Sequence, residues 1–313
     1  MPLIVLGSVF VDIKGYPLDS FILDGRNAGR IEVVHGGVSR NIAENIGNIG
    51  LPCAFVSLVD KTAAAAEVLC RLKEHGVDTE YVRRTDTGMG TWLAVFDNNR
   101  DVAASVSQRP DLLPIADILD EKGDEIFQKA KAVLLELDMD AVIVKRVYAL
   151  AKKYGKPVYA AVANMSLALE NRMYLKDTAC FVCNRQEAGM LFASDYEGKT
   201  PEEVTEDLRR KVEEAGLQAL VVTLGGYGAV YVDGSTGVYG ITPAGKVPVA
   251  DTTGAGDAFF SGTAAGLAYG KTLADACEIG NRLASSVIRT PYNTCPRFSP
   301  AEFGIDPDGV SGI

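Results

Sequence analysis

A glycine turn stands at Ala250-Asp251-Thr252-Thr253-Gly254-Ala255-Gly256-Asp257-Ala258-Phe259-Phe260-Ser261-Gly262, where it opens a predicted helix. Gly254 and Gly256 allow the backbone to approach a ligand closely, and the amides of the turn point toward one place at the positive end of that helix. Asp257 falls in the first helical turn, where a carboxylate either caps the helix or acts as a base beside a bound anion. The stretch therefore predicts an anion hole, and both interpretations of Asp257 stay open at this point.

Around this turn the chain alternates short apolar runs with helical segments. Buried runs separated by helices are typical of a parallel sheet that is covered on both faces. We therefore predict an α/β fold with a doubly wound, mostly parallel sheet. The predicted strands cover residues 3–9, 53–59, 132–137, 157–162 and 219–224, and the predicted helices cover 41–49, 63–74, 141–154, 201–215, 255–269 and 274–288.

Two regions interrupt this rhythm, residues 13–35 and residues 79–108. They lack a helical period and carry short alternating runs, such as 92–96 and 102–106, on either side of a turn at Asn98-Asn99. No low-complexity linker separates them from the rest of the chain. We predict that they form a small second sheet inserted into a single domain that covers residues 1–313.

Composition excludes several classes of protein. The chain is 47% hydrophobic, which argues against disorder, and its 31 Lys and Arg against 41 Asp and Glu give a net charge of −10. That charge argues against a nucleic-acid partner, which a protein binds by neutralising phosphates. No run approaches the roughly 20 apolar residues of a membrane helix. We expect a soluble, cytoplasmic protein that handles small molecules.

Cysteine and histidine usage limits the available chemistry. The chain has 6 cysteines, which we expect to be reduced core thiols; Cys180 and Cys183 have metal-ligand spacing, but no second Cys or His pair follows them. With only 2 histidines and no Gly-x-Ser-x-Gly motif, a serine or cysteine hydrolase is disfavoured. A carboxylate is the better candidate for a catalytic base.

Four motifs, in order along the chain, resemble the signatures of the ribokinase-like (PfkB) family of sugar and nucleoside kinases. They are Gly36-Gly-Val-Ser-Arg-Asn-Ile-Ala-Glu-Asn-Ile-Gly-Asn-Ile-Gly50, Asn184-Arg-Gln-Glu187, Thr223-Leu-Gly-Gly-Tyr-Gly228 and Asp251-Thr-Thr-Gly-Ala-Gly-Asp257. The resemblance implies a ribokinase-like fold with helices on both faces of the sheet and a small β-sheet lid. It also implies an ATP-dependent phosphotransferase that uses Mg²⁺.

The resemblance implies roles for individual residues on the phosphate side. Asp257 takes the acceptor proton, and Gly254, Ala255 and Gly256 form the anion hole. Asn184 and Glu187, which share one helix face, organise Mg²⁺ through water, although Glu187 could instead be only a partner of the helix dipole. The implied nucleotide-binding residues are Thr223, Gly225, Gly226, Gly228 and Asn281.

A monovalent-cation site is implied at Asp251 and Thr253. The segment Arg289-Thr-Pro-Tyr-Asn-Thr-Cys-Pro296, which should complete that site, departs from the glycine-containing ribokinase pattern. Dependence on K⁺ is therefore left open.

The resemblance also implies an acceptor site. Asp12, at the end of the first predicted strand, is well placed to accept hydrogen bonds from sugar hydroxyls. The other implied substrate-binding residues are Gly36, Gly37, Asn41, Thr91 and Asp138. Trp92 either stacks on the substrate or packs within the small sheet.

The acceptor itself is ranked from the motifs. The segment from Gly36 to Asn41 departs from the ribokinase pattern. The run from Asn27 to Ile46, with residues 184–187 and 292–299, resembles pseudouridine kinases more closely, although residues 105–113 and Ala161 depart from that group. We expect transfer of the ATP γ-phosphoryl to a hydroxymethyl oxygen, with pseudouridine (5'-hydroxyl) first, an unphosphorylated pentose or hexose such as ribose or fructose second, and a phosphorylated sugar last. A catalytically silent sugar or nucleotide sensor is disfavoured, because a sensor does not need Asp257.

In relatives the lid sheets also pair two subunits. The resemblance therefore implies a homodimer, and a lid that excludes water when it closes over the acceptor.

Overall fold

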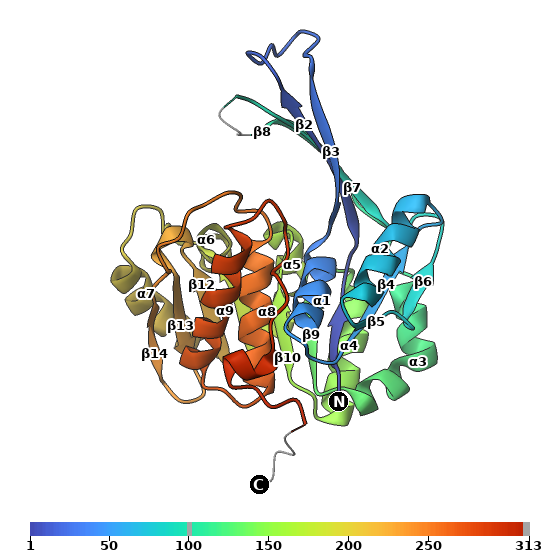
Figure 1. Cartoon of the computed structure of the whole chain (residues 1–313). Helices are drawn as coiled ribbons and strands as arrows, with labels where there is room; N and C mark the ends of the chain where they lie inside the picture. The colour runs from blue at the N-terminus through green and yellow to red at the C-terminus, as the bar shows by residue number, and fades with distance from the viewer. Residues whose placement is uncertain (99–101, 309–313) are drawn as a thin grey trace.

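The computed structural model describes residues 1–98 and 102–308, and the cartoon shows a layered body from which a narrow β-structure projects (Figure 1). The turn expected at Asn98-Asn99 lies partly outside the described residues. The main sheet has the strand order β14-β13-β12-β11-β10-β9-β1-β4-β5, with β6 paired to β4. Its strands are β1 (Leu3–Leu6), β4 (Cys53–Val59), β5 (Val77–Asp78), β6 (Val82–Arg84), β9 (Ala132–Glu136), β10 (Val158–Ala161), β11 (Cys180–Asn184), β12 (Ala219–Thr223), β13 (Ala229–Asp233) and β14 (Tyr239–Thr242).

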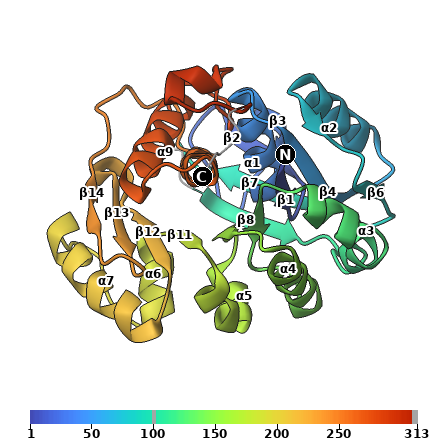
Figure 2. The same cartoon turned by 90° about the horizontal axis from the view of Figure 1, so that it is seen from below.

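Helices cover both faces of this sheet, as the view from below shows (Figure 2). The pairs from β12 to β14 are antiparallel and the other pairs are parallel. One hydrophobic core lies beneath α1 (Val38–Asn48), α2 (Ala63–Glu74), α8 (Ala255–Ala268) and α9 (Leu273–Val287). The other lies beneath α3 (Ile115–Lys129), α4 (Ala141–Tyr154), α5 (Met165–Ala168), α6 (Arg185–Phe192) and α7 (Pro201–Ala215). The predicted doubly wound fold is confirmed.

A second sheet, with the order β3-β2-β7-β8, forms the projection in Figure 1 and is called the lid here. It is built from β2 (Phe10–Pro17), β3 (Gly29–Gly36), β7 (Gly90–Phe96) and β8 (Val102–Gln108). The intervening strands β5 and β6 pair with β4 instead. Residues 77–84 therefore belong to the body, and the later lid insert begins at Gly90.

The first strand is shorter than expected, and this moves Asp12. β1 ends at Leu6, because Gly7 has a φ of +153° and a side chain there would collide with Ser39 and Glu136. The chain then enters the lid at Phe10. The expectation that Asp12 ends the first strand is wrong: Asp12 lies inside β2, at the base of the lid.

Neither a membrane helix nor a metal cluster is found in the part of the chain that the structure describes. No helix there is long and apolar enough to cross a bilayer, and no three His, Cys, Asp or Glu side chains gather as metal ligands. The cysteines are free; Cys70 is exposed and the others are buried.

Helix α8, which follows the glycine turn, packs closely on α9. A Cβ added to Gly262 in α8 would lie 2.8 Å from the Cα and the amide nitrogen of Gly280 in α9. Both neighbours are backbone atoms, so the two helices would have to separate to make room.

Overpacking at this position costs about 1–3 kcal/mol, and alanine gains about 1 kcal/mol over glycine within a helix, so we predict that Gly262→Ala destabilises the protein by up to about 2 kcal/mol. Urea unfolding measures the change. Gly15→Ala is the control, because its Cβ would meet its nearest neighbour, the Ala94 carbonyl oxygen, at an ordinary 3.8 Å. Wild-type stability in Gly262→Ala would contradict the packing described.

Candidate active site

The glycine turn at the start of α8 has one packed side and one open side. Gly254 is the N-cap residue with a φ of +81°, and a side chain on it would overlap the carbonyl oxygen of Asn293. Gly256 faces open space, since a Cβ there would meet nothing within 4 Å. The amide of Ala255 donates to the carbonyl of Thr252 at 3.2 Å. An anion can therefore approach the positive end of α8 from the side of Gly256.

Asp257 lies next to this open side and is only partly exposed. The Nδ2 of Asn41, at the start of α1, donates to its Oδ2 at 2.6 Å. Burial raises the pKa of Asp257 to about 7, although the hydrogen bond from Asn41 acts in the opposite direction; the charge of Glu136 raises the pKa further. The structure thus gives this carboxyl a pKa suited to accepting a proton near neutral pH.

Asp12 approaches the same place from the lid. A Cβ on Gly36 would lie 2.5 Å from the Asp12 carboxylate oxygens, and one on Gly37, whose φ is +98°, would lie 2.8 Å from the carbonyl oxygen of Ser8. Only glycine lets these backbone segments come so close to each other. Burial raises the pKa of Asp12, which the charge of Lys14 partly offsets.

Two further carboxylates stand at the end of β9. The Oδ1 of Asp138 accepts from the amide of Ala163 at 2.9 Å, and its Oδ2 lies 3.5 Å from Arg109 at the end of β8. Burial, and then the charge of Glu136, raise the pKa of Asp138 to about 7. Glu136 is itself buried and accepts from the amide and the hydroxyl of Ser8. The sequence analysis missed Glu136, although a charged residue that ends an otherwise apolar strand is a usable signal.

Thr91 lies on the wrong face of the lid for contact with Asp12. The registers pair Thr91 with Val11 and Trp92 with Asp12, and neighbouring residues of a strand point to opposite faces. Thr91 therefore does not share a face with Asp12, whereas Trp92 does, and contact of Thr91 with the acceptor stays a prediction. The Trp92 ring also packs edge-on against Phe96, with the ring centroids 6.3 Å apart.

The expected nucleotide residues gather at one edge of the sheet. Asn184 at the end of β11 pairs with Thr223 at the end of β12. Gly225 and Gly226 follow, and Cβ atoms added to them would meet nothing within 4 Å. Gly228 has a φ of +96° and packs against the backbone of residues 242–244. This edge therefore offers an open surface of backbone with few side chains.

Asn281 reaches the same region from α9. Its Nδ2 donates to the carbonyls of Thr242 and Pro243 at 3.1 and 3.2 Å. The side chain thus fixes the segment after β14 beside the turn at 225–228.

Asn184 and Glu187 cap α6 reciprocally. The Oδ1 of Asn184 accepts from the amide of Glu187 at 2.9 Å, and the Oε2 of Glu187 accepts from the amide of Asn184 at 2.7 Å. Burial raises the pKa of Glu187, although the bond from the Asn184 amide lowers it. The capping role leaves Oε1 of Glu187 for a further partner, so capping and water-mediated metal binding are compatible.

Asp251 and Thr253 form a local turn. The Oδ1 of Asp251 accepts from the amide of Thr253 at 2.8 Å, and the amide of Ala250 donates to the carbonyl of Ile288 at the end of α9. A monovalent cation at this turn stays a prediction.

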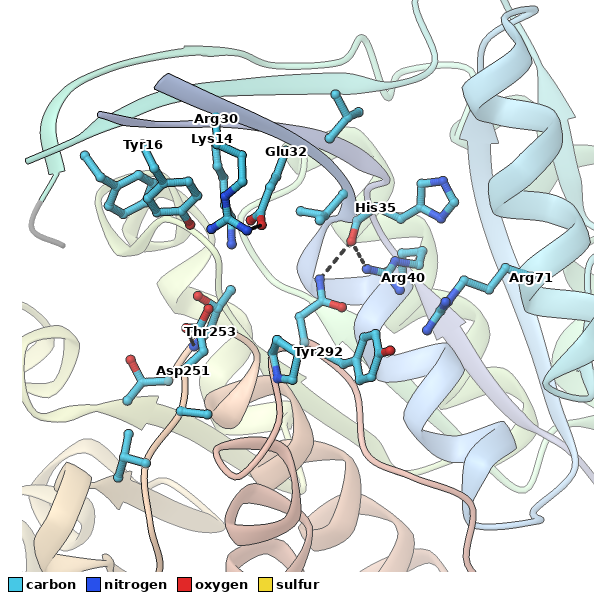
Figure 3. Close-up of a pocket in the computed structure, with 18 of the residues that line it drawn as sticks. Lys14, Tyr16, Arg30, Glu32, His35, Arg40, Arg71, Asp251, Thr253 and Tyr292 are labelled. Carbon is cyan, nitrogen blue, oxygen red and sulfur yellow. Dashed lines mark hydrogen bonds and ion pairs between the residues drawn. The ribbon is translucent and has the colours of Figure 1, made fainter. Parts of the chain in front are cut away.

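A cavity of about 710 Å³ lies between the lid and this turn (Figure 3). Lys14, Tyr16, Arg30 and Glu32 project into it from the lid, above Asp251 and Thr253 (Figure 3). Asp257 and Asp12 do not line it. The cavity therefore flanks the carboxylate cluster on the side of the glycine turn.

A buried ion network, which the sequence analysis also missed, supports the turn at Gly36-Gly37, called the acceptor turn here. Arg40 is 1% exposed, pairs with Glu44 at 2.9 Å, and donates to the carbonyl of His35, which also accepts from Asn293 (Figure 3). Glu44 is bound by Arg71 from α2 as well. Although burial acts to raise the pKa of Glu44, the hydrogen bonds and charges of the two arginines lower it to about 2.

Comparison with known proteins agrees with this geometry. The chain is 34% identical to a guanosine-inosine kinase from Exiguobacterium acetylicum over 92% of this chain and 95% of the relative. It is 26% identical to the pseudouridine kinase of Escherichia coli (strain K12), over 95% and 94%. Among solved structures, a ribokinase from Arabidopsis thaliana in complex with ribose and ATP superposes with a TM-score of 0.80 at 21% identity, over 96% of this chain and 98% of that chain.

A family model described as pfkB family carbohydrate kinase matches residues 2–296, nearly the whole chain. This match covers all the motifs discussed above. The chain belongs to the pfkB family of carbohydrate kinases, and it is an ATP-dependent kinase.

Proposed function

We propose that the chain transfers the γ-phosphoryl of ATP to the 5'-hydroxyl of a nucleoside. The observation that carries this proposal is the partly buried Asp257, with a pKa near 7, beside an open glycine turn at the positive end of α8. Phosphoryl transfer needs positioned charge more than covalent help from the protein, and these groups supply it. The motifs alone rank pseudouridine first, but the likeness to a guanosine-inosine kinase favours guanosine or inosine, with pseudouridine second.

In the proposed reaction, Asp257 accepts the proton of the 5'-hydroxyl. The oxygen forms a bond to the γ-phosphorus, the bond from that phosphorus to the bridging oxygen breaks, and ADP leaves. The amides of Gly254 and Gly256, with the dipole of α8, stabilise the charge on the moving phosphoryl group. The amide of Ala255, which was expected to join them, already donates to the carbonyl of Thr252. The hydrogen bond from Asn41 holds the carboxylate in place.

The acceptor is held by the polar groups around Asp257. Asp12 and Asn41 contact ribose hydroxyls, the backbone at Gly36 and Gly37 lies close to the sugar, and Asp138 contributes its buried carboxyl. The Oδ2 of Asp138 accepts no hydrogen bond, although its ion-pair partner Arg109 lies 3.5 Å away, so it can still accept one from a ligand hydroxyl.

The nucleotide lies along the open edge formed by Thr223, Gly225 and Gly226, with Gly228 and Asn281 shaping its border. Asn184 and Glu187 fit a Mg²⁺ ion held through water, because an oxygen of Glu187 remains after capping and Mg²⁺ keeps several of its waters. Bound there with the nucleotide, Mg²⁺ neutralises phosphate charge. Asp251 and Thr253 stay the candidates for a monovalent cation.

A panel of acceptors tests the proposal. ADP release is measured with guanosine, inosine, pseudouridine, ribose and fructose at one ATP concentration. We expect the highest kcat/KM with guanosine or inosine. Turnover confined to pseudouridine would reverse the ranking of nucleosides, and turnover confined to free sugars would overturn the nucleoside proposal.

Asp257→Asn is the control for that panel. We expect turnover to fall by about 10³-fold, the size of a general-base contribution, while the nucleoside still binds in calorimetry. Retained turnover would contradict the role of Asp257.

We also propose that the lid pairs two copies of the chain. Ile13, Val33, Leu93 and Val106 form one apolar row across its four strands, on the face opposite Asp12 and Lys14. Three of them are more than 40% exposed: Val33 63%, Leu93 44% and Val106 68%. Such a contiguous exposed row is typical of an interaction surface.

Light scattering at micromolar concentration tests this pairing. We expect a dimer for the wild type and a monomer for Leu93→Asp, because a carboxylate in the row would be buried without a partner. Val142→Asp, at a similarly exposed apolar position on α4, should remain dimeric. A monomeric wild type would contradict the proposal.

A further inference from the structure

Lys14 is a buried cation on the inner face of the lid. It alternates with Asp12 and Tyr16 along β2, so the three side chains share one face of that strand. Lys14 is 6% exposed, and its side chain extends into the cavity toward Asp251 and Thr253 (Figure 3). The ammonium group therefore lies between the lid and the loop that leads into the glycine turn.

The ammonium of Lys14 has no hydrogen bond or ion pair with any residue that the structure describes. Its neighbour Arg30 is engaged, with an ion pair to Glu32 at 2.6 Å and a position 5.2 Å from the centre of the Tyr16 ring. The charge of Lys14 acts to lower the pKa of Asp12, but the two side chains lie beyond ion-pair distance. A buried charge without a partner costs free energy, so the site fits an anionic ligand.

The floor of the cavity favours a phosphoryl group as that ligand. Asp251, Thr252 and Thr253 line it and lead directly into Gly254 and the positive end of α8. Gly254 and Gly256 do not themselves line the cavity, so an anion bound at the turn would lie at the border of the cavity, with Lys14 on the side of the lid. One carboxylate in the cavity, Asp251, could repel such an anion. Its Oδ1 already accepts from the amide of Thr253, which offsets part of its charge.

We propose that Lys14 donates to the phosphoryl group as it moves from ATP to the acceptor, so that lid closure completes the anion hole. This inference rests on the proposed kinase reaction. Lys14 keeps its protons throughout: the acceptor proton goes to Asp257, the new bond forms between the acceptor oxygen and phosphorus, and the old bond to ADP breaks. In this proposal the lid does more than cover the substrate, because Lys14 supplies a charge to the reaction.

Steady-state kinetics with the best nucleoside provide the first test. We expect Lys14→Met to lower kcat by about 100-fold or more, as when one preorganised donor to a transition state is removed, with little change in KM for the nucleoside. Lys14→Arg should recover part of the loss. Arg30→Met is the matched control, since it removes a neighbouring lid cation that already has a partner, and we expect turnover close to wild type.

Calorimetry gives a second readout that does not depend on turnover. ADP with Mg²⁺ and aluminium fluoride mimics the moving phosphoryl group, and we expect Lys14→Met to weaken this complex while binding of ADP alone stays the same. Weakened binding of ADP alone would place Lys14 on the bound nucleotide and overturn the inference.

Three other outcomes would also contradict it. Wild-type turnover in Lys14→Met would exclude a catalytic contact. Lower turnover with an unchanged fluoride complex would mean that Lys14 latches the lid to Asp251. Equal losses in Lys14→Met and Arg30→Met would assign the effect to the total charge of the lid. If the wild type neither phosphorylates a nucleoside nor binds the fluoride complex, the proposed function itself fails. Failure of the proposed function is thereby distinguished from failure of the inference on Lys14.

Discussion

The hydrogen bond between Asn41 and Asp257 joins the two halves of the molecule, because it connects the start of α1 to the start of α8 across 216 positions of sequence. The same face of α1 continues this contact to the C-terminal segment. Glu44 accepts from the hydroxyl of Thr294, and Asn45 accepts from the amide of Cys295. Buried polar groups are stable only when they are paired, so these bonds fix the position of α1 relative to the glycine turn.

These hydrogen bonds explain why the turn at Gly36-Gly37 and the turn at Gly254-Gly256 stay aligned. Asn293 donates to the carbonyl of His35 and packs its own carbonyl against Gly254. One residue of the C-terminal segment thus touches both glycine turns. Arg40, which is paired with Glu44, also donates to the His35 carbonyl, and this leaves little freedom for Gly36 and Gly37.

The carboxylates in the cleft share one electrostatic environment. Glu136 raises the pKa of both Asp138 and Asp257, in addition to the effect of burial. Near neutral pH this places two carboxyl groups close to the midpoint of their titration in one site. In the proposed reaction, Lys14 and the dipole of α8 offset the repulsion that a phosphate would otherwise meet from these carboxylates.

Sequence patterns sufficed for the parts of the fold set by local composition. The buried runs, the presence of lid strands and the glycine turn before α8 were predictable, because alternation and glycine placement are local signals. The bounds of the later insert were not, since residues 79–84, predicted to lie in it, belong to the body. The side of the lid to which Thr91 points was not predictable, since it depends on the register between β2 and β7. Arg71 and Thr294, which bind Glu44, and Ser8, which binds Glu136, come from distant segments, and no spacing along the chain reveals those contacts. The i,i+4 spacing of Arg40 and Glu44 is visible in the sequence, but it does not show that the pair is buried.

The central claim is that burial holds Asp257 ready to accept a proton at neutral pH. The most direct measurement is an NMR titration of the protein with isotope-labelled aspartate carboxyl groups, in which the signal of Asp257 is assigned by its absence from Asp257→Asn. We predict a pKa of about 7 for this group, so that the carboxylate form dominates only above that pH. A pKa near the ordinary aspartate value of 3.8 would contradict the account.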